Sequence, residues 1–223
     1  MPLVLPGHEV SLNEPGRVFD RHHHLEAYAA LLIEGSCDEV GDCGRFALRP
    51  GDVLIHRPFD AHQDRIGSRG ARFINFALGE VSEAMFAFVA DLDAVIRMHE
   101  RDPREAAAML TNQLRPRSAT VGDWPDLLAA RLASPVPMRL DSWASGHGLN
   151  PASLSRGFRR AYGVSPKRYR LEQLASHAAR RVRRSNEPLS GIATSCGFAD
   201  QAHMTRTFAS MFGVTPRYLR ALS

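Results

Sequence analysis

The sequence is poor in cysteine and contains no long apolar run. Three cysteines, Cys37, Cys43 and Cys196, stand in 223 residues. They are too few and too odd in number for a disulfide framework, which indicates a reducing compartment. No stretch reaches the roughly eighteen apolar residues of a membrane span, and no charged-then-apolar leader occurs. We therefore expect a cytoplasmic protein with no membrane partner.

Acidic residues are scarce only in the last part of the chain. From Arg139 onward, fourteen Lys and Arg stand against four acids, a net charge of +10, whereas the preceding residues carry fourteen against twenty, a net charge of −6. A positive field neutralises phosphates in a salt-dependent manner that does not depend on base sequence. The segment from Arg139 is therefore the candidate nucleic-acid-binding part. A nucleoid-type packing protein would be basic throughout, so this class is disfavoured.

The basic segment contains two copies of one pattern, about fifty residues apart, as expected for an internal repeat. In each copy a short helix ends at a glycine, and a capped second helix with an apolar stripe ends at another glycine before a Ser/Thr-Pro pair. The matching residues are Gly148 and Gly197, Asn150 and Asp200, Leu154 and Met204, Phe158 and Phe208, Gly163 and Gly213, Ser165 and Thr215, and Pro166 and Pro216. Between the copies, Pro166 to about Arg184 lacks internal Gly and Pro, which predicts one long bridging helix.

These residues resemble the DNA-binding domain of the AraC/XylS family of transcription regulators, which carries two helix-turn-helix units bridged by a helix. The resemblance covers roughly Leu140 to Ser223. It implies a regulator that binds double-stranded DNA in a sequence-specific manner, with RNA polymerase as a partner and a homodimer as its assembly. A helical bundle that uses the same caps only for packing is the alternative reading.

The recognition helices are expected at Asn150 to about Tyr162 and Asp200 to about Phe212, in successive major-groove segments. With the apolar stripes turned inward, the residues left to face DNA are Ala152, Ser153, Ser155, Arg156, Gln201, Ala202, His203, Thr205 and Arg206. Arg156 and Arg206 occupy equivalent positions, and an arginine can contact guanine through two hydrogen bonds.

The first eighty residues are short runs rich in Val, Ile, Phe and Tyr, separated by Gly, Pro and Asp. Many short strands with frequent turns predict a small β-barrel or jelly roll. The expected fold class is therefore α+β, with this barrel followed by an all-α domain of two helix-turn-helix units bridged by a long helix. We assign 1–80 to the barrel, 81–137 to connecting helices and a linker, and 138–223 to the DNA-binding domain.

Two spaced motifs refine the barrel assignment. The spacing of Gly16, His22, His24, Tyr28 and Gly35 resembles the first cupin motif, and that of Gly51, Pro58 and His62 resembles the second. Cupins are common sensor domains in the AraC family, so the resemblance implies a site for a small-molecule effector in the barrel. The sequence departs from the metal-binding pattern because Tyr28 stands where Glu is usual, and Asp60 stands where Gly is usual.

Five polar side chains are candidates for the effector site: His22, His24, Tyr28, His56 and His62. On a strand, His22 and His24 point to one face, where they would meet His62. Three imidazoles with an open position suit a divalent transition metal such as zinc. Interior histidines can equally hydrogen-bond an organic effector, so the sequence leaves both ligands open.

Helical periodicity is expected between the two parts of the chain, with an apolar stripe of Met85, Phe88, Leu92, Val95, Ile96 and Met98. This stripe would either pack on the barrel or form a dimer interface, and Ser134 to Pro137 is the expected linker. A second candidate function is a metal-dependent cupin enzyme with a nucleic-acid-binding tail. That reading predicts a complete metal set, which Tyr28 breaks, and it does not explain the repeated helix-turn-helix, so we expect no enzyme.

Overall fold

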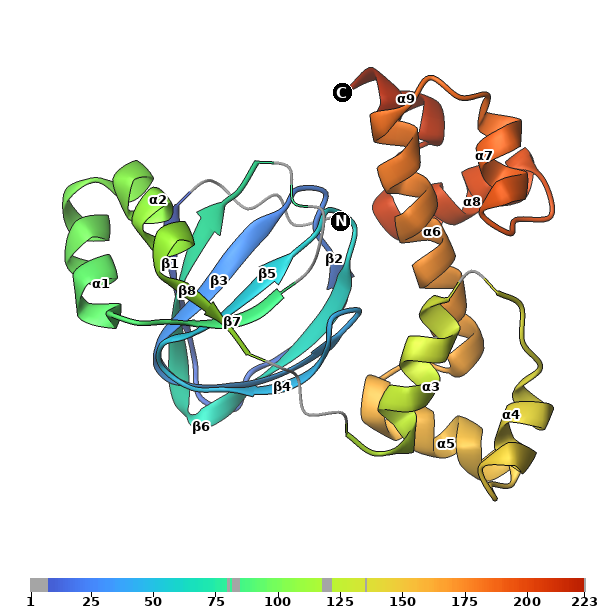
Figure 1. Cartoon of the computed structure of the whole chain (residues 1–223), viewed down its shortest axis with the longest axis horizontal. Helices are drawn as coiled ribbons and strands as arrows, with labels where there is room; N and C mark the ends of the chain where they lie inside the picture. The colour runs from blue at the N-terminus through green and yellow to red at the C-terminus, as the bar shows by residue number, and fades with distance from the viewer. Residues whose placement is uncertain (1–7, 80, 82–84, 118–121, 135, 223) are drawn as a thin grey trace. The chain divides into compact units, whose positions relative to one another are not determined.

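The computed structural model describes residues 8–79, 81, 85–117, 122–134 and 136–222. The described chain forms two compact units, one ending at Arg117 and the other beginning at Gly122 (Figure 1). The division therefore falls before the expected linker of Ser134 to Pro137, and residues 85–117 belong to the same unit as residues 8–79. Each unit is described separately below.

The N-terminal unit is built on one antiparallel sheet. Its strands are β1 (Glu9–Asn13), β2 (Val18–His23), β3 (Tyr28–Gly41), β4 (Gly44–Leu48), β5 (Asp52–His56), β6 (Ala61–Ala77), β7 (Met85–Val89) and β8 (Leu114–Pro116). The strand order is β1-β6-β3-β5-β7-β8, with β2 paired to β6 and β4 paired to β3. Among the described strands, β1 and β8 do not pair, so the sheet is not closed. The expected barrel is corrected to an open sheet.

The two long strands, β3 and β6, bend where they pass close to each other. Gly35 has φ of +82°, and a Cβ atom there would lie 1.9 Å from the carbonyl oxygen of Gly70 on β6. The β3–β6 register shifts on both sides of this point, between Leu32 and Glu34 and between Gly35 and Cys37. Only glycine fits such an approach in this conformation, so Gly35 allows the sheet to curl.

Alternate residues of β3 enter two different apolar layers, as strand geometry requires. Ala30 and Leu32 belong to the inner layer, and Ala29 and Leu31 belong to the outer one. Two helices, α1 (Leu92–Arg101) and α2 (Pro103–Gln113), cover the outer layer with three buried residues, Val95, Ala106 and Leu110. Figure 1 shows α1 and α2 together on one side of the sheet.

The expected helix over Met85 to Met98 is wrong in its first part. Met85–Val89 is strand β7, which pairs with β5. Its residues form a continuous apolar run without a helical period, and such a run favours a buried strand. The helix begins at Leu92, where the Asp91 carboxylate accepts a hydrogen bond from the Ala94 amide at 2.9 Å. Leu92, Ile96 and Met98 then pack against the outer layer, so this part of the stripe packs on the sheet.

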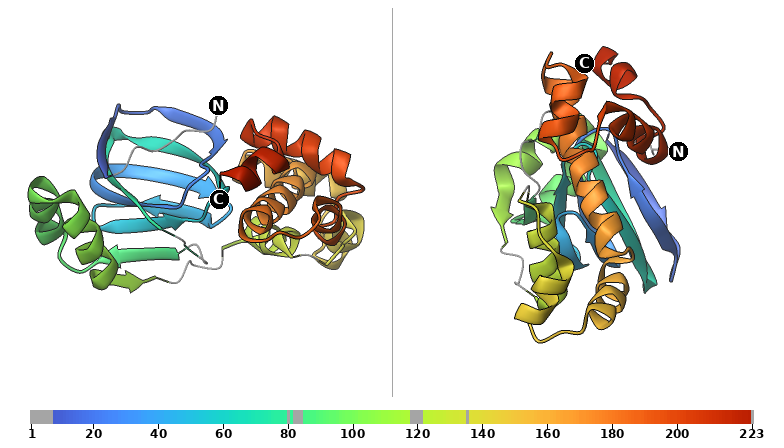
Figure 2. Two further views of the ribbon diagram at one scale, coloured as in Figure 1. Left: turned by 90° about the horizontal axis from the view of Figure 1, so that it is seen from above. Right: turned by 90° about the vertical axis from the view of Figure 1, so that its right-hand side faces the viewer.

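The C-terminal unit is helical, as expected. Its helices are α3 (Trp124–Ala133), α4 (Leu140–Gly146), α5 (Pro151–Tyr162), α6 (Pro166–Arg184), α7 (Leu189–Ser195), α8 (Gln201–Phe212) and α9 (Pro216–Ala221). The expected long bridging helix is confirmed as a helix and is α6. The two segments expected to be recognition helices are also helical and are α5 and α8. Figure 2 shows α4 and α5 near one end of α6, and α7, α8 and α9 near the other. In the described part of the chain, no helix combines the length and the apolar character needed to cross a membrane.

Helix α3 and the segment after it are fastened to this helical unit. The Tyr162 hydroxyl donates to Asp126 at 2.8 Å, and the Arg170 guanidinium donates to the carbonyl oxygen of Leu132 at 2.6 Å. Arg131 donates to the carbonyl oxygens of Val136 and Pro137 at 2.8 and 3.1 Å. The expected linker is therefore held inside the C-terminal unit.

Candidate functional site

The N-terminal unit contains a cavity of about 260 Å³ on the inner side of the sheet. Four of the five predicted effector-site residues line it: His22, His24, Tyr28 and His62. The fifth, His56, is almost completely buried and does not line the cavity. Apolar residues such as Phe19, Ile66 and Phe73 form other parts of the wall.

Strand register brings the polar residues of the cavity together. His22 on β2 lies opposite His62 on β6, and Tyr28 on β3 lies opposite His56 on β5. The centres of the His22 and His62 rings are 4.3 Å apart, and those of the His24 and His62 rings are 5.2 Å apart. The side chains that the two cupin-like motifs predicted to meet are thus neighbours.

Tyr28, which stands where metal-binding cupins have a glutamate, is part of this cluster. Its hydroxyl lies 3.1 Å from Nε2 of His62, within hydrogen-bonding distance. Its ring stacks on His56, with the ring centres 4.6 Å apart and an angle of 19° between the planes. Burial, reinforced by the nearby carboxylates, raises the pKa of Tyr28 well above its ordinary value. The phenol is therefore neutral at physiological pH, and its hydroxyl donates to Nε2 of His62 or accepts from it according to the His62 tautomer.

Two acidic residues of the cavity wall were missed in the sequence. Glu39 on β3 and Asp64 on β6 are register partners, and both line the cavity. Neither belongs to a recognisable motif, but the i, i+2 spacing of Asp64 from His62 on one strand was a usable signal, since such residues share a face. Because Glu39 and Asp64 lie beside the histidines, the cavity is rich in hydrogen-bond acceptors.

The close packing of these groups shifts their protonation. Burial, followed by the Glu39 charge, raises the pKa of Asp64 well above its ordinary value. Burial and the neighbouring histidines hold the pKa of His62 well below 6.5. Burial opposes the charged form of His56, but the surrounding carboxylates together raise its pKa. A neutral His62 keeps a nitrogen lone pair, which can accept a hydrogen bond or bind a metal.

Two sets of side chains in the described residues have the chemistry of metal ligands. One is the predicted set of His22, His24 and His62, and the other is Glu39, His56 and His62. In each set the candidate ligand atoms lie within 4.8 Å of one another. Nδ1 of His22 lies 2.8 Å from the carbonyl oxygen of Asp20, and a donor hydrogen bond there would leave Nε2 as the coordinating atom.

The C-terminal unit contains two helix pairs of the same construction, α4–α5 and α7–α8. In each pair the first helix ends with one equivalent hydrogen bond, from the Leu149 amide to Ala144 and from the Phe198 amide to Ala193, both at 2.9 Å. The next helix starts at a side-chain cap. Asn150 accepts from the Ala152 amide at 2.9 Å, and Asp200 accepts from the His203 amide at 2.6 Å.

The second helix of each pair also ends in the same way. Gly163 and Gly213 adopt left-handed conformations, with φ of 74° and 71°. Ser165 and Thr215 then cap the following helices, each accepting a backbone hydrogen bond at 3.2 Å. Leu154, Phe158, Met204 and Phe208 are all fully buried, as the sequence predicts. Helices α5 and α8 therefore each have a buried inner face and an exposed outer face.

The predicted DNA-facing residues lie on the outer faces. Seven of them are exposed: Ala152, Ser153, Ser155, Arg156, Gln201, Ala202 and Arg206. The other two are half-buried and make local contacts. The His203 ring packs against Phe198 with ring centres 5.3 Å apart, and the Thr205 hydroxyl donates to the Gln201 carbonyl oxygen at 2.9 Å. These two have less freedom to reach a base than the exposed seven.

Further exposed basic residues surround these faces. Arg159 and Arg160 lie on α5, and Lys167 and Arg217 occupy equivalent second positions of α6 and α9. The sequence could have indicated Lys167 and Arg217, because each directly follows the proline of a Gly-Val-Ser/Thr-Pro segment. A basic residue at these positions is suited to a phosphate group.

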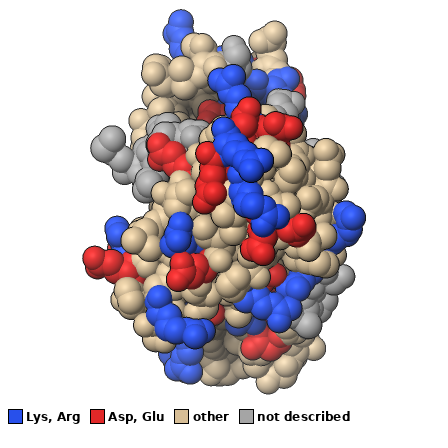
Figure 3. Space-filling view, turned by 90° about the vertical axis from the view of Figure 1, so that its left-hand side faces the viewer, with Lys and Arg blue, Asp and Glu red and all other residues tan. Residues whose placement is uncertain are grey.

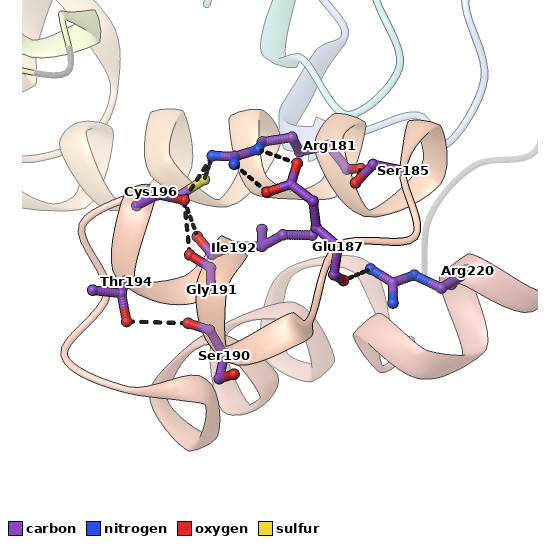
Figure 4. A network of polar contacts seen from close by, with 10 residues as sticks. Arg181, Ser185, Glu187, Ser190, Gly191, Ile192, Thr194, Cys196 and Arg220 are labelled. Atoms are coloured by element: carbon purple, nitrogen blue, oxygen red, sulfur yellow. Dashed lines mark hydrogen bonds and ion pairs between the residues drawn. The ribbon is translucent and has the colours of Figure 1, made fainter.

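Arg181, in the densest basic run of α6, is half-buried, and its guanidinium is used in contacts within this unit. Its guanidinium forms an ion pair with Glu187 through two contacts and donates to the Ser195 hydroxyl at 2.6 Å. Arg220 donates to the Glu187 carbonyl oxygen at 2.8 Å. Figure 4 shows Glu187 between the two arginines, beside the end of α7. The Arg181–Glu187–Arg220 network thus joins α6, α7 and α9, and Arg181 is not a phosphate contact in this arrangement.

Surface charge is mixed on the face that Figure 3 draws. Basic and acidic side chains alternate there, and no broad area of one sign is visible. This view therefore displays no phosphate-binding patch, in keeping with the acidic balance of the N-terminal part of the sequence.

The paired units, with their shared caps and free outer faces, define a helix-turn-helix domain. A family model described as a helix-turn-helix domain matches residues 143–221. The matched residues lie within the C-terminal unit, so the predicted resemblance of this unit to AraC/XylS-type DNA-binding domains is confirmed.

Two relatives illustrate the match. The HTH-type transcriptional activator RhaS of Escherichia fergusonii is 37% identical over 83 residues, which are 35% of this chain and 30% of RhaS. The multiple antibiotic resistance protein MarA of Escherichia coli is 31% identical over 84 residues, which are 38% of this chain and 66% of MarA. The chain thus spans less than a third of the length of RhaS.

Among solved structures, ToxT from Vibrio cholerae aligns with 96% of this chain and 97% of its own, at 11% identity and a TM-score of 0.43. A likeness at this level decides neither the fold nor the ligand of the N-terminal unit.

Proposed function

We propose that this protein is a sequence-specific transcription regulator of the AraC type, controlled by a small molecule in the cavity of a cupin-like sensor unit. The observation that carries the proposal is the equivalence of α5 and α8. Each packs its apolar face within the unit that α6 bridges, and each exposes polar residues near its N-terminal end. Such helices enter successive major-groove segments on one face of a duplex.

The outer faces assign separate tasks to the exposed residues. Arg156 and Arg206 each contact a guanine, which is worth about 1–3 kcal/mol of discrimination against the wrong base. Gln201 has the right chemistry for adenine. Ala152 and Ser153 are short, so the first unit reads fewer bases than the second.

Selection of binding sites from a randomised DNA pool tests this assignment. The full chain is expected to enrich one extended motif. Arg156→Ala and Arg206→Ala should each relax the preference at one base pair, whereas the control Arg159→Ala should weaken all sites alike. If both variants keep the preference of the unchanged protein, the base-reading assignment is wrong.

The cavity supplies the effector site in this proposal, with His22, His24, Tyr28 and His62 facing the ligand and His56 behind them. Ala30 also lines the cavity, so Ala30→Leu is expected to fill part of it. Native mass spectrometry of the full chain should detect a small molecule that the Ala30→Leu protein loses. Retention of the same mass by a correctly folded Ala30→Leu protein would place that molecule elsewhere.

The effector changes DNA binding only if it prefers one of two states of the protein, and coupling of about 1–3 kcal/mol is typical. In this proposal those states differ in which DNA half-sites a homodimer reaches, and the regulator works with RNA polymerase in the cytoplasm. A fragment beginning at Gly122 should still bind the site and no longer respond to the effector. A metal-dependent enzyme with a nucleic-acid-binding tail remains less economical, because it leaves both helix-turn-helix units unexplained.

A further inference from the structure

The inner end of the cavity holds three buried side chains whose placement goes beyond a simple effector pocket. Glu39, His56 and His62 are 4%, 1% and 3% exposed. They come from β3, β5 and β6, in which β3 pairs with both other strands. Their candidate ligand atoms, one from each side chain, lie within 4.8 Å of one another. The fold therefore holds a carboxylate and two imidazoles around one buried point.

Several polar atoms at this point lack a hydrogen bond within the described part of the chain. They are Oε1 of Glu39, both ring nitrogens of His56 and Nδ1 of His62. His56 Nε2 lies 3.5 Å from Glu39 Oε2, which is an ion-pair distance and too long for a strong hydrogen bond. Buried polar atoms almost always have a partner. Four such atoms in three neighbouring side chains indicate that a binding partner belongs among them.

We propose that Glu39, His56 and His62 bind one divalent transition metal ion, with zinc as the reference ion. Two imidazoles and one carboxylate are a recurrent set of protein ligands for such ions, and they leave coordination positions open. An ion at this point supplies a partner for the Glu39 oxygen and for one ring nitrogen of each histidine, and its charge balances the buried carboxylate. This metal site does not rest on the DNA-binding function proposed above.

The three proposed ligands also determine which side of the bound ion is open. Glu39 and His62 line the cavity, whereas His56 lies outside its lining. An ion bound by the three is therefore at the cavity wall, and its open positions face the cavity. An oxygen or nitrogen atom of a cavity ligand, or a water molecule, is the chemistry that fits there.

The rival set is the one expected from the sequence, His22, His24 and His62. It shares His62 but contains no carboxylate, and His22 is only half-buried. It would leave the buried Glu39 oxygen and both His56 nitrogens without a partner. The set with Glu39 gives a partner to more of the unpaired buried atoms than the three-histidine set does. We therefore prefer the set with Glu39.

Zinc binding to the full chain tests the proposal. Protein stripped with a chelator and dialysed against Zn²⁺ is expected to hold one zinc per chain by elemental analysis and to melt at a higher temperature than the stripped protein. Glu39→Gln and His56→Gln should each weaken zinc binding by tenfold or more, the order seen when a metal site loses a supporting group. The matched controls His22→Gln and His24→Gln, which belong only to the rival set, should bind zinc about as tightly as the unchanged protein.

X-ray absorption on zinc-loaded wild-type protein gives a second readout that needs no variant to fold. Two imidazoles with oxygen ligands are expected, whereas three imidazoles would overturn the proposal in favour of the rival set. Loss of zinc in the His22 and His24 variants with retention in the Glu39 and His56 variants would do the same. Wild-type protein that binds no zinc would show the cluster to be a metal-free buried ion pair.

Discussion

The two helix-turn-helix units share a backbone plan and differ in what they present outward. Fifty positions separate Leu154 from Met204 and Gly163 from Gly213, and each residue pair has the same structural role. At the positions of Arg159 and Arg160 in the first unit, the second unit has Ala209 and Ser210. The inner residues are thus constrained by packing, while the outer residues are free to specialise. We infer that the first unit contributes more phosphate affinity and the second more base discrimination.

The units also differ in how they are supported. Helix α3 packs beside α5 in the first unit, where a Cβ atom on Gly157 would lie 2.5 Å from the Trp124 ring. In the second unit the additional support beyond its apolar core is the partly exposed Arg181–Glu187–Arg220 network. Apolar burial stabilises more strongly than an exposed ion pair. Removal of the supporting contacts should therefore lower the unfolding free energy more in the first unit than in the second.

The largest effect is expected from removing α3. Leu128 and Leu132 are buried, and burial of each leucine side chain is worth about 1.5–3 kcal/mol. A fragment that begins at Pro137 lacks both, as well as the Asp126 partner of Tyr162. Denaturant unfolding should therefore give it a much lower unfolding free energy than a fragment that begins at Gly122. Equal midpoints and slopes for the two fragments would contradict the supporting role of α3.

A glycine-to-alanine pair compares the two units more finely. Gly157→Ala forces Trp124 to move, and overpacking typically costs about 1–3 kcal/mol. The control Gly191→Ala lies on α7, where a Cβ atom meets nothing within 4 Å, so the better helix propensity of alanine should stabilise by up to about 1 kcal/mol. Thermal unfolding of both proteins should show shifts of opposite sign. Shifts of the same sign would mean that α3 does not constrain α5.

Exchange of the outer residues tests the division of labour on DNA. Arg159→Ala with Arg160→Ser gives the first unit the residues of the second. If both arginines contact phosphates, the slope of log affinity against log salt concentration should fall by about 1.8. The motif preferred in site selection should stay the same. The reciprocal Ala209→Arg with Ser210→Arg should steepen the slope, and no change in either protein would remove the proposed difference.

The smallest effect is expected in the polar network. Arg181 lowers the pKa of the exposed Glu187 carboxyl below its ordinary value of 4.5. A lowered folded-state pKa gives stability that is present above the unfolded pKa and lost as the pH falls through the folded one. Glu187→Gln should therefore destabilise slightly at neutral pH and not at low pH, and added salt should reduce the difference. A pH-independent difference in melting temperature would show that the charge is unimportant.

The helical unit was predictable because its signals are local. A cap such as Asn150, a proline at the first helical position and a glycine such as Gly163 act within one turn of chain, so sequence alone locates the helices. The attachment of α3 was not predictable in this way. It depends on Trp124 meeting Gly157 and on Asp126 meeting Tyr162, and neither pair leaves a local pattern.

The sheet unit was less predictable because strand pairing is long-range. The motif histidines were expected to meet, and the register brings them together. Glu39 escaped notice because its position beside His56 and His62 depends on the bend of β3 at Gly35. The run from Met85 to Val89 was misassigned because an apolar run of five residues fits a helix or a strand until its partner strand is known.

The length of helix α6 limits how the spacing between the two halves of the DNA site can change in evolution. Its nineteen residues span about 28 Å at 1.5 Å per residue. Insertion of a single residue would turn one unit about 100° relative to the other, so only changes near whole numbers of turns keep both recognition helices on the same side of a duplex. On the proposed base-reading assignment, a lineage can change its preferred bases one at a time through residues such as Arg206, but it can change the spacing between the two groups of bases only in jumps of several residues.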